Sequence, residues 1–335
     1  MLAGVLTALA LIPEVISFSV IAGVDPQVSL IASVVLCLAM SVFGGRPAMV
    51  TAAAGSVALV IGPMVHQHGV GYILPAVILA GIIQILFGLC GMARLMRFIP
   101  PAPLIAIVAL TLYTATTGQQ LPTVGDEGSM SGGLPGFTAL TVPLNLTTLQ
   151  IIWPCALSIA FVGLMESLLT AKLVDDLTHT SSNKSRESAG LGIANILAGC
   201  YGGIAGCAMI GQTIVNVEMG RARSRLSTVI AGLVLLLLVT ALSQVMAKIP
   251  MAVLAGVMVI VAVKTFSWHS IRPGELARNP WPETLVMLVT VAATVGTSNL
   301  AIGVLAGIVA MAIIPRRLRA KAQATLETAS PDPEK

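Results

Sequence analysis

The sequence predicts an all-α, multi-pass membrane protein that is built from two inverted repeats. Three observations support this fold class: an apolar composition, apolar runs along the whole chain, and one sequence pattern that occurs in both halves. Of the 335 residues, 56% are hydrophobic and 10% are charged, and the mean hydropathy is +0.95. These values lie outside the range of soluble globular domains, so the chain is expected in a lipid bilayer.

About twelve segments are apolar enough to be embedded in the bilayer. Several are shorter than the roughly 20 residues that a full span needs, which indicates half-helices or tilted segments. In chain order they are 2–22, 30–43, 49–65, 74–93, 104–113, 149–173, 191–206, 210–218, 226–246, 253–263, 284–297 and 302–314.

Lys and Arg residues give the orientation, because they concentrate on the cytoplasmic side of membranes. If both termini are cytoplasmic, five basic groups fall on that side: Arg94 with Arg97, 172–186, 221–225, 264–278 and 316–321. Lys248 falls outside, and Arg46, beside an interrupted segment, is ambiguous. The stretch 118–145 has no Lys or Arg, as expected of an external loop. We therefore expect a multi-pass protein of the cell (inner) membrane, whose net charge of +4 reflects topology and not nucleic acid binding.

The repeated pattern combines an acid inside an apolar helix with a later segment of small residues. In the first half Glu14 is followed by Pro47–Thr51, and in the second half Glu166 is followed by Cys207–Gly211. Each copy then runs through an apolar helix with an early glycine to an Ile-Pro pair. Secondary transporters use such interrupted segments in two inverted halves to build a binding site at the bilayer midplane. The repeat therefore predicts a carrier.

Glu14 and Glu166 are the two acids that lie deep inside predicted spans. A carboxylate at the bilayer centre costs at least about 2.5 kcal/mol, so it usually has a function. Ser17 and Phe18 lie one helical turn after Glu14, and Thr170 lies one turn after Glu166. A carboxylate and a hydroxyl on one face are suited to hold a proton or Na⁺. The alternative is that each acid caps a neighbouring broken helix for structural reasons.

Two small, polar stretches, Thr51–Ser56 and Gly211–Thr213, each open an apolar segment after a glycine-rich approach. The free N–H groups and the positive dipole end of an interrupted helix favour an anion. Two such helix ends facing each other would form an anion-binding cradle without any arginine. Close helix packing is the alternative explanation for the same composition.

Other chemistry is not indicated. The five cysteines have no metal-ligand or redox spacing and are interpreted as small packing residues. The four histidines form no metal-binding pattern. Neither a nucleophile–base pair nor a cofactor loop occurs, so the sequence predicts no enzyme and no cofactor other than a coupling H⁺ or Na⁺.

At these residues the chain resembles the SulP family of anion transporters, which includes sulfate permease-like proteins, a bicarbonate carrier and the motor protein prestin. The resemblance lies in segments 13–23, 43–49, 97–100, 158–171 and 195–220. It implies a seven-plus-seven inverted repeat that is divided into core and gate domains and works by an elevator-like movement.

The resemblance also implies site residues. The anion would be lined by Phe18, Ala53, Ala54, Gly55, Gly211, Gln212 and Thr213. Glu166 and Thr170 match the coupling-cation positions of the bicarbonate carrier, with Glu in place of Asp, and Glu14 is the equivalent acid of the first repeat. Gly211 and Gln212 stand where prestin-like members have a Ser-Arg pair, which disfavours a channel-like or motor role.

Two departures from the family pattern affect the domain organisation. Three spans follow Ile249-Pro250, but only 101–117 follows Ile99-Pro100 before the external loop, so two gate-domain spans are expected to be absent near residues 100/101. The family's regulatory domain is also expected to be absent after the last span. The predicted division is 1–117 (first repeat), 118–147 (external loop), 148–320 (second repeat) and 321–335 (polar cytoplasmic tail).

The leading functional hypothesis is a proton-coupled symporter of a small inorganic anion or dicarboxylate. A Na⁺-coupled bicarbonate symporter is the first alternative, because Glu166 and Thr170 suit either cation. A transport-dead scaffold or sensor is the second, because of the absent spans. A purine or uracil carrier is disfavoured by the motifs. The expected partners are the small anion and the lipid bilayer, and a homodimer is left open.

Overall fold

The computed structural model describes residues 1–91, 137–143 and 145–241, with short pieces between 285 and 310. The chain divides into two compact units. The first unit comprises Met1–Phe98 and Gln119–Val261, and the second comprises Ile99–Gly118 and Ala262–Lys335. Almost all of the described residues belong to the first unit, which contains the elements that follow.

The first half begins with two long apolar helices and continues through a short strand into a half-helix. Pro26 opens the second helix, and the Asp25 carboxylate accepts a hydrogen bond from Gln27 N, so this helix starts where sequence rules predict. In order, the elements are α1 (Leu2–Ala22), α2 (Pro26–Phe43), β1 (Thr51–Ala53), α3 (Gly55–His68), the 3₁₀ turn η1 (Val70–Tyr72) and α4 (Ile73–Leu89).

The second half repeats this order of elements. Asn145 and Asn183 cap its first two helices through their side-chain oxygens. The elements are α6 (Leu146–Thr178), α7 (Lys184–Cys200), β2 (Gly206–Ala208), α8 (Ile210–Ile214), the π-helical turn η3 (Val215–Met219) and α9 (Leu226–Ala241). In both halves one residue, Ala54 or Met209, separates a three-residue strand from the following helix. The internal repeat predicted from the sequence is therefore present in the fold.

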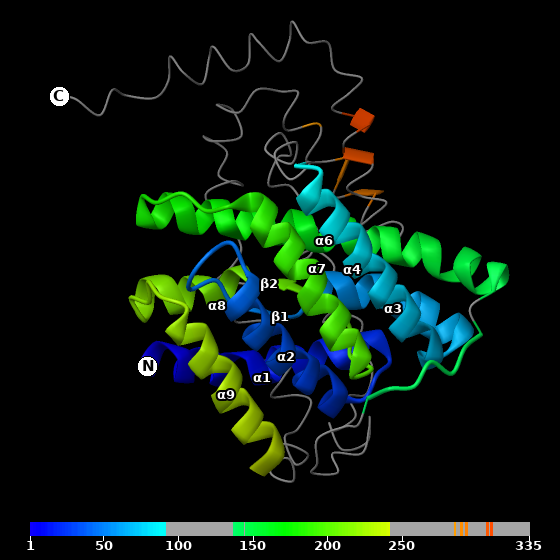
Figure 1. The fold of residues 1–335 in the computed structure, drawn as a ribbon, viewed down its shortest axis with the longest axis horizontal. Helices are drawn as coiled ribbons and strands as arrows, with labels where there is room; N and C mark the ends of the chain where they lie inside the picture. Colours follow the sequence, from blue (N-terminus) through cyan, green and yellow to red (C-terminus); the bar gives the residue numbers. More distant parts are fainter. Residues whose placement is uncertain are drawn as a thin grey trace, which may run out of the picture. The chain divides into compact units, whose positions relative to one another are not determined.

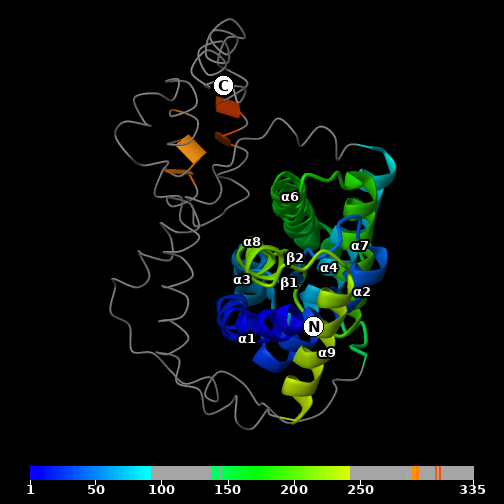
Figure 2. The ribbon, with the colours of Figure 1, turned by 90° about the vertical axis from the view of Figure 1, so that its left-hand side faces the viewer.

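β1 and β2 form a two-stranded antiparallel ribbon, which we call the ribbon. Thr51 pairs with Ala208, Ala52 with Cys207, and Ala53 with Gly206. In Figures 1 and 2 the ribbon lies amid the helices, between α1 and α6. The strands show that the sequence repeat aligned the two halves in the wrong register. Pro47–Thr51 ends at the first residue of β1, whereas Cys207–Gly211 starts inside β2 and ends inside α8. These two motifs are thus not structural equivalents.

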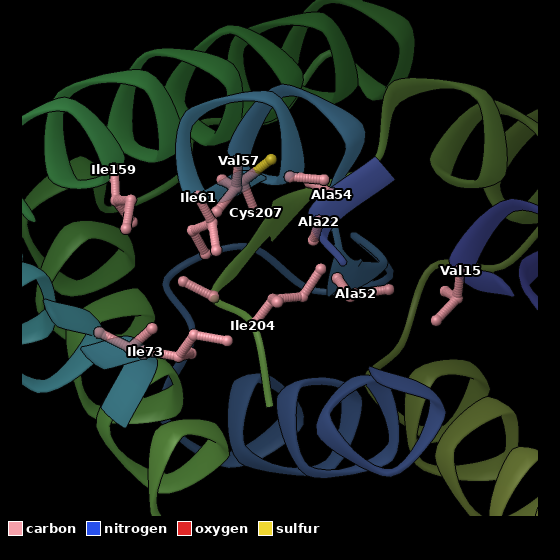
Figure 3. Close-up of a cluster of buried hydrophobic side chains, with 14 of the residues drawn as sticks. Val15, Ala22, Ala52, Ala54, Val57, Ile61, Ile73, Ile159, Ile204 and Cys207 are labelled. Atoms are coloured by element: carbon pink, nitrogen blue, oxygen red, sulfur yellow. The ribbon is translucent and has the colours of Figure 1, made fainter. Parts of the chain in front are cut away.

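Small residues allow the elements around the ribbon to pack closely. In Figure 3 Ala52 and Cys207 of the ribbon lie among apolar side chains from surrounding helices. A Cβ on Gly81 of α4 would lie 2.6 Å from the Gly192 carbonyl oxygen of α7, so these helices meet backbone to backbone. In the second unit, Gly307 approaches the side chain of Thr290 in the same way, as expected of a packing glycine.

Four helices of the described part are long and apolar enough to span a membrane: Leu2–Ala22, Pro26–Phe43, Val70–Leu89 and Leu146–Thr178. The predicted segment 49–65 is divided into β1 and α3, and 210–218 is divided into α8 and the π-helical turn. The first segment is therefore interrupted, as its composition predicted, whereas 210–218 is continuous and the break of the second half lies just before it, at β2. The expected segments 104–113 and 253–263 lie outside the described residues.

Large leucines are exposed on the outer faces of α1, α4 and α9, as expected where helices face lipid. The described end of the predicted external loop contacts the end of α7. There Phe137 stacks on Tyr201 with ring centroids 4.8 Å apart, and Thr138 N donates to Cys200 O over 2.9 Å.

Candidate functional site

The ribbon leads directly into two helices whose first turns have no side-chain cap. β1 continues through Ala54 into α3, and β2 continues through Met209 into α8; neither cap residue accepts a hydrogen bond with its side chain. The first N–H groups of a helix have no partner inside the helix. The positive dipole ends of both helices therefore lie beside the ribbon, with N–H groups that have neither a cap side chain nor a partner within their own helix. We call the ribbon and the starts of α3 and α8 the cradle.

The predicted anion-lining residues all belong to the cradle or contact it. Ala53, Ala54, Gln212 and Thr213 are buried, whereas Phe18, Gly55 and Gly211 are partly exposed.

Phe18 of α1 packs directly against the start of α3. A Cβ on Gly55 would lie 2.5 Å from the Phe18 ring, so only glycine allows this approach. The ring therefore covers the first turn of α3, and its role in lining an anion stays a prediction.

The Glu166 carboxylate connects α6 to both sides of the cradle. Its Oε2 accepts a hydrogen bond from Ser56 Oγ of α3 over 2.6 Å, and another from Cys207 Sγ of β2 over 3.0 Å. Glu166 itself is partly exposed, whereas Ser56 and Cys207 are buried. The acid is thus held by donors from two elements.

Glu14 contacts the cradle from the other side. Its buried carboxylate accepts a hydrogen bond from the Gln212 side chain at the start of α8. Glu14 belongs to the first half and Gln212 to the second, while Glu166 belongs to the second half and Ser56 to the first. Each predicted acid therefore binds the half-helix of the opposite repeat.

The hydroxyls that were expected to accompany these acids are used differently. Thr170 Oγ1 donates to the Glu166 carbonyl oxygen over 2.8 Å and lies 3.3 Å from the Ala208 carbonyl oxygen. Ser17 Oγ donates to Pro13 O over 2.8 Å. Helical Ser and Thr side chains readily bond to the carbonyl four residues earlier. Neither hydroxyl is therefore hydrogen-bonded to the neighbouring carboxylate, and the hydroxyl that donates to Glu166 is that of Ser56; a cation-binding role of the predicted pairs stays a prediction.

Thr213 fixes the end of the ribbon. Its Oγ1 accepts a hydrogen bond from Val50 N over 3.0 Å, and Met209 N donates to Val50 O over 2.8 Å. Thr213 therefore holds the start of α8 against the residue that precedes β1.

Polar side chains from the surrounding helices satisfy the outer edges of the ribbon, and sequence reasoning missed them. Ser33 of α2 accepts from Ala53 N over 3.1 Å, and Ser167 of α6 accepts from Ala208 N over 3.0 Å. Asn195 of α7 accepts from Gly206 N over 2.8 Å and donates to Gly206 O over 3.2 Å. Their signal was present in the sequence, because each is a polar residue inside an otherwise apolar helix.

A second polar cluster lies where the α2–β1 loop meets the α6–α7 turn. The buried Arg46, ambiguous in the topology, pairs with Asp175 over 3.0 Å and donates to Thr178 and Thr180. Its guanidinium therefore covers the end of α6, the helix that carries Glu166.

A third acid, Glu187, is fully buried and precedes the apolar run that begins at residue 191. Its Oε2 accepts from Gly45 N over 2.7 Å and from Arg46 N over 3.0 Å. Burial raises the pKa of Glu187 to about 7, although these N–H groups and the charges of Lys184 and Arg225 act to lower it.

Comparison with known proteins supports the architecture. The model of the sulfate permease family matches residues 1–109 and 100–273. YbaR of Bacillus subtilis is 43% identical over 363 residues, which cover 93% of this chain and 75% of the relative. The bicarbonate transporter BicA of Synechocystis is 34% identical over 177 residues, which cover 52% of this chain and 30% of the relative.

Two solved structures share the fold. The transmembrane domain of a cyanobacterium bicarbonate transporter BicA superposes with a TM-score of 0.73 at 21% identity, covering 92% of this chain and 96% of that domain. The structure of SLC26A9 has a TM-score of 0.72 at 13% identity, covering 92% of this chain and 63% of that one. Both likenesses show the inverted-repeat fold. The chain is therefore a multi-pass membrane protein that belongs to the sulfate permease family of anion transporters.

Proposed function

We propose that this protein is a proton-coupled symporter of a small inorganic anion or dicarboxylate, with the anion in the cradle and the proton on Glu166. An elevator-like movement of the cradle would carry both across the membrane. The observation that carries the proposal is the Glu166 carboxylate, which binds Ser56 of α3 and Cys207 of β2 beside two uncapped helix starts.

The donors of the cradle suit a small anion. The N–H groups of the first turns and the two helix dipoles favour negative charge, and Gly55 and Gly211, which have no side chain, are partly exposed at the two helix starts. Phe18 shields one helix start with an apolar ring. A small dehydrated oxyanion fits such neutral donors.

Charge balance favours a co-transported cation. The cradle residues that the structure describes include no Lys or Arg, so a bound anion beside an ionised Glu166 would place two uncompensated negative charges inside the membrane. A proton on Glu166 removes one of them. Because Cys207 donates to the same oxygen, a thiol stands where Na⁺ would prefer an oxygen ligand, and this favours H⁺ over Na⁺.

Na⁺-coupled bicarbonate symport is the alternative. It is supported by the 34% identity with a protein named as a bicarbonate transporter over half of this chain. Thr170, which lies near both Glu166 and β2 through its hydrogen bonds, would supply an oxygen ligand.

A transport-dead scaffold or sensor is the third candidate. The two matches of the family model meet at residues 100–109, at the junction where the sequence predicts two absent gate-domain spans. Whether the carrier is active or inactive, we propose that it lies in the cell membrane with both termini cytoplasmic.

Uptake into proteoliposomes distinguishes the three. A proton gradient directed into the proteoliposomes, in the absence of Na⁺, is expected to drive accumulation of labelled sulfate. Bicarbonate, fumarate and succinate are tested as competitors. Accumulation that needs a Na⁺ gradient and ignores pH would favour the bicarbonate alternative. No counterflow of any of these anions, with the protein correctly inserted, would favour the transport-dead scaffold.

A further inference from the structure

We propose that Cys207 is a positioning residue for coupling: together with Ser56, its thiol holds the Glu166 carboxylate between the two sides of the cradle. This inference rests on the proposed function, in which Glu166 carries the proton. It assigns a role to a cysteine that the sequence pattern marked only as a packing residue.

Three groups from three elements meet at one oxygen atom. Oε2 of Glu166 (α6) lies 2.6 Å from Ser56 Oγ (α3) and 3.0 Å from Cys207 Sγ (β2). The hydroxyl and the thiol lie 3.9 Å apart. Because both donors point to the same acceptor, the carboxylate is fixed relative to α3 and β2 at once.

Packing alone does not explain a thiol at Cys207. Cys207 is fully buried, and its backbone is already held in the ribbon opposite Ala52. At the paired position of β1, Ala52 fills the space with a methyl group. In Figure 3 Cys207 lies among buried apolar side chains, so Cys207→Ala would keep the strand pairing and remove the sulfur atom together with its donor.

A donor on the carboxylate stabilises its ionised form more than its protonated form. Removing the donor should therefore make proton release from Glu166 harder. Since Cys207 lies in β2, three residues before the start of α8, a shift of the anion-binding strand would change this hydrogen bond. The thiol thus links the position of the cradle to the proton on the acid.

The chain offers a matched control. Cys37 of α2 is also a fully buried thiol at the ribbon, but its Sγ donates to the Thr51 carbonyl oxygen over 3.0 Å and not to an acid. Cys37→Ala removes the same side-chain volume and also removes a thiol donor. That donor, however, binds Thr51 of the other strand, β1.

The test measures the pH dependence of proton-driven anion uptake by the full chain in proteoliposomes. In Cys207→Ala the half-maximal pH is expected to move upward by about one unit, the size of one lost hydrogen bond to a charged acceptor, with the anion KM little changed. Cys207→Ser, which retains a donor, should restore the parental profile, and Cys37→Ala should not shift it. Ser56→Ala, which removes the other donor, should shift the profile in the same direction.

A parental profile in both Cys207→Ala and Ser56→Ala would overturn the inference, and so would equal shifts in Cys207→Ala and Cys207→Ser. Glu166→Gln separates this failure from that of the proposed function. If Glu166→Gln keeps pH-driven accumulation, Glu166 does not carry the proton and the proposed function fails. If it loses accumulation while Cys207→Ala and Ser56→Ala match the parent, only the positioning role fails.

Discussion

At the scale of single residues, the two membrane acids are bound by donors from the opposite half of the chain. The sequence predicted Glu14 and Glu166 from their burial cost alone. It did not predict their partners, because Ser56 is 110 residues away from Glu166 and only the fold brings them together. The local partners that helical spacing suggested, Ser17 and Thr170, bond instead to backbone carbonyls of their own helices.

The two acids are expected to differ in function. Glu166 is partly exposed and bridges both sides of the cradle, whereas Glu14 is buried and binds Gln212. Glutamine mimics a protonated acid, so Glu166→Gln should retain anion exchange and lose pH-driven accumulation. Glu14→Gln should retain both. The measurement is counterflow and gradient-driven uptake with the same proteoliposomes; loss of accumulation in Glu14→Gln alone would assign the proton to Glu14.

Gly55 sets the distance between the aromatic ring and the helix start. In Gly55→Ala the new methyl group would collide with the Phe18 ring and displace it from the cradle. Overpacking of this kind costs about 1–3 kcal/mol, and if the displaced ring carries this cost into the bound state, anion affinity should fall by about fivefold to about 150-fold. Isothermal titration calorimetry or a thermal-shift titration with the transported anion measures this affinity. Adding Phe18→Ala removes the collision, so a double variant no better than Gly55→Ala would argue against this contact.

At the scale of elements, the interrupted helices were predictable and the ribbon was not. Glycine-rich approaches and small residues marked both interruptions. A strand of three residues has no periodicity to detect, and each strand is paired with a partner from the other half. For the same reason the sequence repeat matched Pro47–Thr51 to the wrong part of the second copy.

Asn195 is expected to hold β2 in place. It bonds Gly206 on both N and O, and its amide also donates to Gln84 Oε1 over 2.8 Å. Asn195→Ala leaves Gly206 N buried without this partner, at a cost of about 1–3 kcal/mol. The expected result is a lower unfolding temperature in detergent and weaker anion binding. Asn195→Asp keeps the acceptor for Gly206 N but loses the donors, so it should fall between the parent and Asn195→Ala. An unchanged unfolding temperature in Asn195→Ala would contradict this role.

At the scale of the whole molecule, composition and the basic residues indicated a multi-pass membrane protein, and the order of elements in the two halves bears out the repeat. The link between the halves at the Arg46–Glu187 cluster was not foreseen. Arg46 belongs to the first half, whereas Asp175 and Glu187 belong to the second. Nothing in the local sequence marks a loop arginine as a buried ion-pair partner.

Glu187 makes the stability of the fold depend on pH. Its pKa is raised from 4.5 to about 7 by burial, so the folded state favours the protonated acid. The stabilising contribution is complete below about pH 4.5 and is lost as the pH rises through about 7, with an upper limit of about 3 kcal/mol. Glu187→Gln removes this titration while retaining an oxygen that accepts from Gly45 N and Arg46 N. Its unfolding temperature in detergent should therefore fall less than that of the parent between about pH 5 and about pH 8. Glu218, an exposed acid in the second half, provides the control. Glu218→Gln should keep the parental dependence of unfolding temperature on pH. The same parental dependence in Glu187→Gln would show that the Glu187 carboxyl does not titrate in the fold.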